Sequence, residues 1–341
     1  MKKGLTINTV GILYAFIHFS VEVSCFYFLF SRLSDNPLWW ALALLYDALA
    51  FVPQSFFGLI ADKHRKFNYG ALGCILMIIG FVVPVNILAL FILCIGNALV
   101  HIAGAEKTLN GANGKITPCS IYVGGGSAGV ITGQLLGLLG LPLLSLIPLG
   151  LMVLSLGLTF VISALYSPQK DTKAFEITAD RSTALIVIFA FIAVAIRSYI
   201  GYAIPTDWNK TKLQAILLFF FMGAGKILGG VLSDKFGYRK TTFISLICSL
   251  PFLLFGNSVM TVSLIGIGLF SMTMPITVAI LVSELKDNPC FAFGITTVAL
   301  FAGIVPAFFI KPEGLLFHQL TVLILSLISA VSLFICIQKG S

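Results

Sequence analysis

Charged side chains are scarce in this sequence: Asp, Glu, Lys and Arg together make up 10% of its residues, whereas hydrophobic residues make up 58%. The mean hydropathy is +1.04. Soluble domains carry about 25% charged residues, and their cores cannot bury so large an apolar share. A bilayer can accommodate it. The composition therefore excludes an ordinary soluble domain and predicts an integral membrane protein.

The motifs of several chemistries are missing as well. None of the seven cysteines belongs to a C-x-x-C pair, so the sequence predicts neither a disulfide framework nor a zinc site. There is no Walker motif, because the glycines at 124–126 are not followed by G-K-[ST]. The net charge of +8 comes from cations between apolar blocks, which indicates membrane topology rather than nucleic-acid binding. We expect no enzyme activity, no cofactor, no metal and no nucleic-acid partner.

Apolar blocks follow one another along the whole chain, and most are long enough to cross roughly 30 Å of hydrocarbon as a helix. The first block has no small-residue cleavage pattern after it, so we interpret it as a mature span rather than a signal peptide. We predict an all-α membrane protein with twelve transmembrane helices, near 7–31, 37–60, 68–83, 86–105, 119–139, 143–166, 183–205, 213–233, 241–256, 258–284, 290–309 and 315–337.

The basic residues between these blocks indicate how the chain is oriented. With both termini in the cytoplasm, fifteen basic residues fall in cytoplasmic breaks and four fall on the opposite side. This bias agrees with the positive-inside rule. The loops are short, which favours the inner membrane of a prokaryote. We therefore expect a multi-pass protein of the plasma membrane with both termini inside.

Two segments half a chain apart resemble each other. Residues 58–66 read GLIADKHRK and residues 230–240 read GVLSDKFGYRK, which places Asp62 and Asp234 172 positions apart. Two predicted helix starts repeat at a similar offset, because 117–122 read TPCSIY and 288–293 read NPCFAF. We predict two six-helix halves, 1–166 and 183–341, joined by a cytoplasmic linker at 167–182. Parallel repeats of this kind are typical of transporters.

The repeated loop resembles the signature loop of the major facilitator superfamily, G-x-x-x-D-[RK]-x-G-x-[RK]-[RK]. The second copy matches it at every position, with Gly230, Asp234, Gly237 and Arg239. The first copy has Gly58 and Asp62 but carries Arg65 in place of the motif glycine. The resemblance implies two pseudo-symmetric six-helix bundles and transport by alternating access.

The resemblance also implies a cytoplasmic gate, in which each motif aspartate meets a helix of the opposite half. An aspartate gains roughly 0.3–2 kcal/mol near the positive N-terminus of a helix, and only while the two are close. We expect Asp62 to meet the helix that starts near Pro289 and Asp234 to meet the helix that starts near Pro118. Plain topological anchoring by the basic residues is the alternative.

Glycines and prolines inside the spans predict close packing and bends. Small residues recur every four positions in 119–139 and 213–233, at Gly125, Gly129, Gly133, Gly137, Gly225 and Gly229. Such spacing lets helices approach closely in lipid. The resemblance implies that these two helices are neighbours across the halves. Pro53 and Pro275 each free a carbonyl four residues earlier and predict bends.

Ionisable residues at membrane depth are costly and therefore mark functional sites by default. Tyr14, His18 and Glu22 recur every four residues along the first helix, and Asn97 and His101 have the same spacing further on. The resemblance implies that helices 1, 4, 7 and 10 line a central cavity. The predicted cavity residues are Tyr14, His18, Glu22, Asn97, His101, Arg197, Tyr199, Tyr202, Lys226 and Thr273.

Several of these side chains have chemistry suited to ion coupling. Glu22 or Asp47 can load and release a proton, with His18 assisting. A permanent structural ion pair is the alternative for Glu22, and a structural role or a sodium site is the alternative for Asp47. We expect Arg197 to bind an anionic group, because guanidinium pairs bidentately with carboxylate or phosphate.

Other candidates have equally ordinary interpretations. Asn97 and His101 can simply join helices by hydrogen bonds. The Lys226 side chain either extends toward the cytoplasmic interface or forms a structural pair, or else it faces the cavity.

Together these features predict a secondary transporter that moves a small polar or anionic organic solute and is coupled to protons. Sodium coupling is the less favoured choice of ion. Efflux of lipophilic compounds, or lipid translocation, is the alternative on the same fold, and the thirty phenylalanines leave it open. We expect a monomer whose partners are its solute, its coupling ion and the lipid bilayer.

Overall fold

The computed structural model describes the chain except for residues 1–3, 169–172, 204–205, 311–313 and 339–341. Within the described residues every regular element is a helix, and the only extended pairing is an isolated bridge between Thr178 and Ile337. Ten helical segments are long and apolar enough to cross a membrane. The chain is therefore a multi-pass membrane protein, as its composition predicted.

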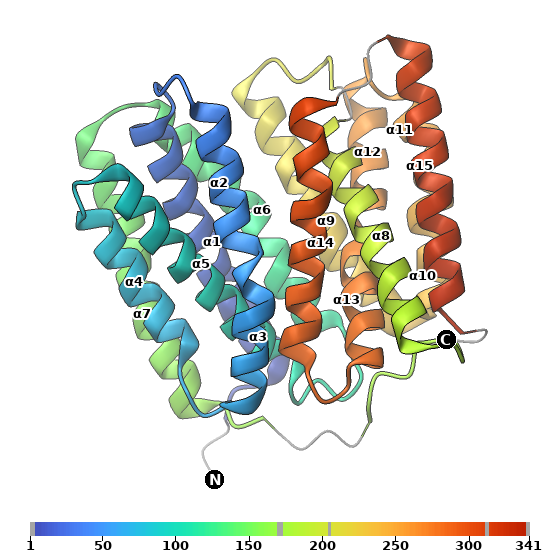
Figure 1. The fold of residues 1–341 in the computed structure, drawn as a ribbon, viewed down its shortest axis with the longest axis horizontal. Helices are drawn as coiled ribbons and strands as arrows, with labels where there is room; N and C mark the ends of the chain where they lie inside the picture. Colours follow the sequence, from blue (N-terminus) through green and yellow to red (C-terminus); the bar gives the residue numbers. More distant parts are fainter. Residues whose placement is uncertain (1–3, 169–172, 204–205, 311–313, 339–341) are drawn as a thin grey trace.

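The first half of the chain forms one group of helices (Figure 1). Its elements are α1 (Ile7–Phe28), η1 (Leu29–Leu33), α2 (Trp39–Phe51), α3 (Pro53–Lys63), α4 (Tyr69–Val82), α5 (Asn86–Leu109), α6 (Thr117–Leu138), η2 (Pro142–Ser145) and α7 (Leu146–Leu165). The π-helical turn η1 continues α1, so the two cross the membrane as one segment.

The second half forms the other group. Its elements are α8 (Thr183–Ala203), α9 (Lys212–Phe236), α10 (Tyr238–Phe243), η3 (Ile244–Cys248), α11 (Ser249–Phe255), α12 (Met260–Ser271), α13 (Thr273–Glu284), α14 (Pro289–Phe309) and α15 (Leu315–Cys336). Every predicted span overlaps at least one of these helices. The two that are not among the ten long segments are 68–83, which is the short helix α4, and 241–256, which is covered by α10, η3 and α11. The number twelve stays a prediction.

Both predicted proline bends are present. Helix α2 ends at Phe51 and α3 begins at Pro53, while α12 ends at Ser271 and α13 begins two residues before Pro275. Proline cannot donate the backbone hydrogen bond that would join the two pieces. Each pair of helices therefore crosses the membrane as one interrupted segment.

The two groups of helices meet along the middle of the molecule, where α6 packs against α9 and α14 packs against α3 and α5 (Figure 1). The start of α1 and the end of α15 lie at one edge of the bundle. The described part of the linker packs there too, because the backbone N–H of Ile177 donates to Ser283 Oγ at 3.1 Å and Ser283 Oγ donates to the Phe175 carbonyl at 2.9 Å. The domain limits at 167–182 stay a prediction.

The four-residue glycine ladder of α6 faces α1 of the same half. A side chain at Gly125 would meet the carbonyl of Ala15, and one at Gly133 would meet that of Val23. The expected contact between α6 and α9 exists, but it runs through Gly124, whose carbonyl lies against Gly223. Neighbouring positions on a helix point about 100° apart, so a single residue separates the two faces.

Candidate functional site

The motif aspartate of the second half lies at the N-terminus of α6. Asp234, near the end of α9, accepts hydrogen bonds from the backbone N–H groups of Ile116 and Thr117 at 3.0 and 2.8 Å, and from Thr117 Oγ1 at 2.5 Å. The Tyr238 hydroxyl donates to it at 3.3 Å. The first helical N–H groups have no partner within the helix, so a carboxylate satisfies them. The residue has the partner that the resemblance implied.

The first-half aspartate has the equivalent place on α14. Asp62 accepts from the backbone N–H groups of Cys290 and Phe291 at 3.1 and 2.9 Å. We call these two contacts, Asp62 on α14 and Asp234 on α6, the latches. Gly58 makes the first possible, because a side chain there would collide with the backbone of Cys290, and Gly230 lies in the same way against Ser120. Their role as a gate stays a prediction.

The two latch loops turn differently. Gly237 has φ 95° and ψ 152°, a conformation open to glycine and strained for other residues. In the first copy α3 ends at His64 with φ −122°, so the chain turns without a left-handed residue and Arg65 is tolerated. The guanidinium of Arg239 lies 5.5 Å from the centre of the Phe334 ring in α15 and so binds within its own half.

A cluster of three ligating side chains lies inside the first half, between α1 and α5. His18 Nε2 lies 3.0 Å from His101 Nε2, and Glu22 Oε1 lies 3.6 and 3.5 Å from these two nitrogens. All three side chains are buried. The sequence predicted His18 and Glu22 on one face of α1, and the structure adds His101 to them. We call this set the histidine–glutamate cluster.

Backbone carbonyls fix both imidazole rings of the cluster. His18 Nδ1 lies 3.1 Å from the carbonyl of Tyr122, and His101 Nδ1 lies 3.0 Å from that of Asn97. Because a carbonyl can only accept, each Nδ1 carries the proton. The hydroxyl of Tyr122 donates to the carbonyl of His101 at 2.9 Å and ties α6 to α5. No sequence pattern marked Tyr122 as a site residue, although it lies in the repeated segment TPCSIY.

Other side chains hydrogen-bond to Glu22 or leave room for the His18 ring. Asn97 Nδ2 lies 3.5 Å from Glu22 Oε1 and 3.2 Å from the hydroxyl of Tyr46. Room for the His18 ring comes from Gly126, since a side chain at that position would overlap the ring. Tyr46 and Gly126 are further residues that sequence reasoning missed. The glycine run at 124–126 was the available signal for Gly126, but it was interpreted as helix packing.

Two buried or partly buried cations of the second half interact with each other, and one of them contacts the other group of helices. Lys226 Nζ donates to Ser127 Oγ of α6 at 2.9 Å, so the ammonium reaches across the interface between the halves. It interacts electrostatically with both Arg197 and Glu22. Arg197 is 8% exposed, and its Nη1 lies 3.5 Å from Thr277 Oγ1. Within the described residues its Nη2 has no hydrogen-bond partner and the guanidinium forms no ion pair.

Other predicted cavity residues have separate surroundings. Tyr14 packs edge-on against Tyr122 with ring centres 6.1 Å apart. The Tyr199 hydroxyl donates to the carbonyl of Ile310 just beyond α14, and Thr273 Oγ1 donates to a carbonyl of the preceding turn. The side chain of Tyr202 is outside what the structure describes. The structure therefore brings together His18, Glu22, Asn97 and His101, with Lys226 and Arg197 opposite.

Asp47 is buried in α2 beside Tyr46. In the part of the chain that the structure describes, its carboxylate forms no ion pair within 4.0 Å. It interacts electrostatically with Glu22. Asp47 is thus a second buried acid near the cluster but not a member of it.

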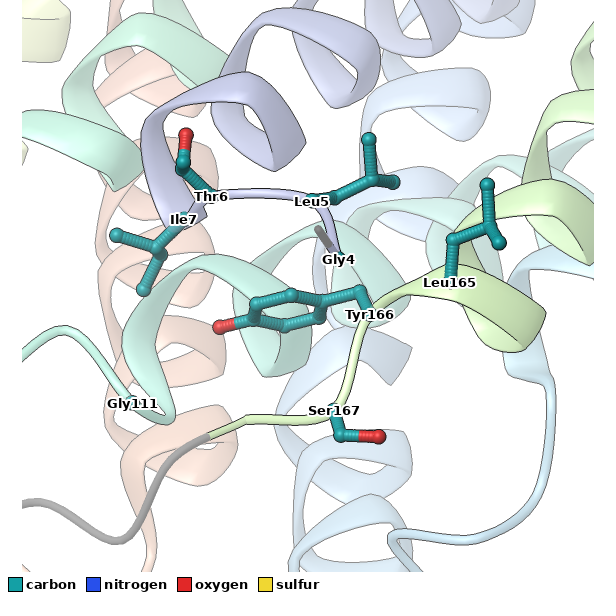
Figure 2. Close-up of a pocket in the computed structure, with 8 residues that line it drawn as sticks. All are labelled: Gly4, Leu5, Thr6, Ile7, Gly111, Leu165, Tyr166 and Ser167. Carbon is teal, nitrogen blue, oxygen red and sulfur yellow. The ribbon is translucent and has the colours of Figure 1, made fainter. Parts of the chain in front are cut away.

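A cavity of about 500 Å³ lies elsewhere, at the start of α1 and the end of α7 (Figure 2). The ring of Tyr166 forms one wall, and Gly4, Thr6 and Ser167 are among the lining residues. None of the predicted cavity residues lines it. Among the described residues that line it, none is charged.

Solved structures with a similar fold are transporters. A bacterial homologue of the iron transporter ferroportin, in an outward-facing state, aligns over 97% of this chain and 98% of its own length with a TM-score of 0.63 and 12% identity. The fucose:proton symporter of E. coli aligns over 95% and 98% with a TM-score of 0.62 and 13% identity. A nucleoside transporter aligns over 96% and 98% with a TM-score of 0.51 and 16% identity.

No protein-family model and no curated protein matches the sequence itself. The likeness is one of architecture, and it extends over nearly the full length of both partners in each comparison. It agrees with the repeated loop, the paired latches and the meeting of two helix groups. The chain has the fold of the major facilitator superfamily transporters.

Proposed function

We propose that the protein is a secondary transporter that moves a small polar or anionic organic solute between the two halves by alternating access. The observation that carries this proposal is Arg197. Its guanidinium is buried at membrane depth, one nitrogen lacks a partner within the described residues, and no carboxylate there neutralises it. An uncompensated buried charge is costly, so a ligand that supplies the opposite charge gains much from binding there.

Lys226 supports an anionic group in the solute. It is a second cation that interacts with Arg197, and within the described residues its ammonium is held by a neutral hydroxyl and forms no ion pair. A carboxylate or phosphate can pair bidentately with the guanidinium and accept from the ammonium as well. The structurally similar transporters are named for a sugar, iron and a nucleoside, and these differ too widely to indicate a class of solute for this protein. The selection rests on these two residues.

Alternating access is supported by the latches. Both join the halves at the same edge of the bundle, and both use a carboxylate on a helix N-terminus. Such contacts exist only while the halves are close at that edge, so they stabilise one of two states. We infer that this edge is cytoplasmic, from the distribution of basic residues. Proton coupling belongs to the same proposal, with Asp47 as the carrier, because proton binding cancels its buried charge.

The proposal is tested by ligand binding to the purified protein. A panel of small carboxylates and phosphates is screened for thermal stabilisation, and each hit is measured in counterflow in proteoliposomes. Arg197→Ala is expected to weaken binding of a hit by about 30-fold or more, because loss of one partner of a buried charge pair costs about 2–5 kcal/mol. Arg197→Lys is expected to recover little of the lost binding affinity, since an ammonium cannot pair bidentately with the anion.

The matched control is Arg181→Ala, which removes an exposed arginine of the linker and is expected to leave binding unchanged. Unchanged affinity in Arg197→Ala would refute the role of this residue. If lipophilic cations stabilise the protein and no anion does, the chain belongs instead to the efflux or lipid-translocating class.

A further inference from the structure

The histidine–glutamate cluster has the composition and spacing of a metal site. Its three ligating atoms, His18 Nε2, His101 Nε2 and Glu22 Oε1, lie 3.0, 3.5 and 3.6 Å apart. Zinc and similar ions bind nitrogen and carboxylate oxygen at about 2.0–2.2 Å with tetrahedral geometry. The edges of such a tetrahedron are roughly 3.3–3.6 Å long. Two of the three separations fall in this range, and the third is shorter by about 0.3 Å.

The proton positions leave both ligating nitrogens free. Each Nδ1 donates to a backbone carbonyl, so when both rings are neutral the two Nε2 atoms carry lone pairs directed at the same space. Two lone pairs facing each other at 3.0 Å repel, and a cation between them removes the repulsion. Metal-binding histidines almost always have this second hydrogen bond, which orients the ring and raises its basicity.

The charge of Glu22 is also available. Within the described residues, the two histidines are its only partners for an ion pair within 4.0 Å. Lys226 is the cation of the other half that interacts with it, but the ammonium is held by Ser127 and forms no ion pair with the carboxylate. A buried carboxylate beside two neutral imidazoles favours a bound cation.

We propose that His18, Glu22 and His101 bind a divalent first-row transition-metal ion. Two imidazoles and one carboxylate suit zinc, iron and their neighbours, and a three-ligand site keeps one position open for water or an anion. The site lies wholly within the first half of the chain. It goes beyond the proposed solute site, because it uses neither Arg197 nor Lys226.

Cobalt(II) is the probe, because its visible absorption reports tetrahedral coordination. The chain has four histidines, and two of them, His64 and His318, lie outside the cluster. The double variant His64→Gln/His318→Gln, purified with a tag free of histidine, therefore keeps only the histidines of the cluster. It is expected to bind one Co²⁺ per chain with an intense visible band, and Zn²⁺ is expected to displace it.

Glu22→Gln and His101→Gln in this background are expected to lower Co²⁺ affinity by about 100-fold or more, since even outer partners of a metal site contribute 10–100-fold. Gel filtration checks that each variant is folded. If the double variant His64→Gln/His318→Gln binds no Co²⁺, the proposal is refuted, whether or not the Glu22→Gln and His101→Gln variants are folded. A proton shared between the two Nε2 atoms is then the alternative occupant of the cluster. Co²⁺ binding that survives His101→Gln also refutes the proposal.

Arg197→Ala separates this proposal from the proposed function. It is expected to keep the Co²⁺ band and its intensity while losing the thermal stabilisation by small anions. Loss of anion binding without loss of Co²⁺ therefore supports both sites. Absence of anion binding in the parent protein would refute the solute site alone, and absence of Co²⁺ binding would refute the metal site alone.

Discussion

At the scale of single residues, the His18 ring occupies space that exists because residue 126 has no side chain. A Cβ at Gly126 would overlap the imidazole, so Gly126→Ala is expected to displace the ring from His101. Overpacking of this kind costs about 1–3 kcal/mol. The variant is expected to lower the midpoint of thermal unfolding and to weaken Co²⁺ binding at least tenfold. Both are measured on the purified protein.

Gly150→Ala is the matched control. Gly150 also lies inside a membrane helix, α7, but nothing surrounds the position of its absent Cβ within 4 Å. The control is expected to leave both measurements unchanged. Normal Co²⁺ affinity in Gly126→Ala would show that the ring position does not matter for the ion.

The sequence predicted some partners within the cluster but not all of them. His18 and Glu22 are four residues apart on one helix, and such pairs share a face whatever the helix packs against. The pairing of His18 with His101 depends instead on how α1 crosses α5, which periodicity does not encode. The contact between Tyr122 and His18 could not be predicted from the sequence either, because His18 is held by the backbone carbonyl of Tyr122 and not by its side chain.

At the scale of helices, the two latches differ in strength. Within the described residues, Asp234 accepts three hydrogen bonds from the opposite half and one from Tyr238 of its own half, whereas Asp62 accepts two from the opposite half. Asp234→Asn is therefore expected to favour the open state more than Asp62→Asn, by about 1–2 kcal/mol, or roughly 5- to 30-fold in population. Native cysteines report this shift, because Cys119 is buried at the third position of α6 and Cys290 is buried at the second position of α14.

The measurement is the rate of alkylation in single-cysteine backgrounds that retain either Cys119 or Cys290. Both rates are expected to rise in Asp234→Asn, and by less in Asp62→Asn. A third background retains only Cys25, which is buried away from the latches in α1; it is the control and is expected to react at the same slow rate in the parent and in both variants. Equal rates in the parent and both variants would contradict the gate.

Motifs predicted the helix ends better than they predicted the helix faces. A polar residue followed by Pro and Cys marks the starts of α6 and α14, and a carboxylate is bound at both. Helices α6 and α9 are neighbours, as the resemblance implied, but the four-residue glycine ladder of α6 packs on α1 and not on α9. Spacing shows that glycines share a face, but the neighbour of that face is decided by tertiary packing.

At the scale of the whole molecule, the proposed proton coupling requires an acid that the proposed gate can expose to either side. Asp47 is the candidate, since it is buried and forms no ion pair within 4.0 Å in the described part of the chain. Asp47→Asn is expected to abolish uptake driven by a pH gradient and to preserve counterflow, which needs no net proton movement. Both assays use the anion identified by the binding screen.

Asp287→Asn serves as its control, because Asp287 is an exposed acid in the loop before α14. It is expected to keep both activities. Full dependence of uptake on the pH gradient in Asp47→Asn would remove Asp47 as the proton carrier.

The cluster has one further consequence, which follows from where its ligands originate. His18 and Glu22 come from α1 and His101 comes from α5, so all three belong to the same half, and the α6 glycines join α1 to α6 almost backbone to backbone. If the proposed movement of one half against the other exposes the cluster to each side in turn, the distances within the cluster stay the same. An ion would therefore bind with the same intrinsic affinity from either compartment. The direction of its net flow would then depend on the concentrations, the voltage and any proton that moves with it, and not on a difference in affinity between the two states.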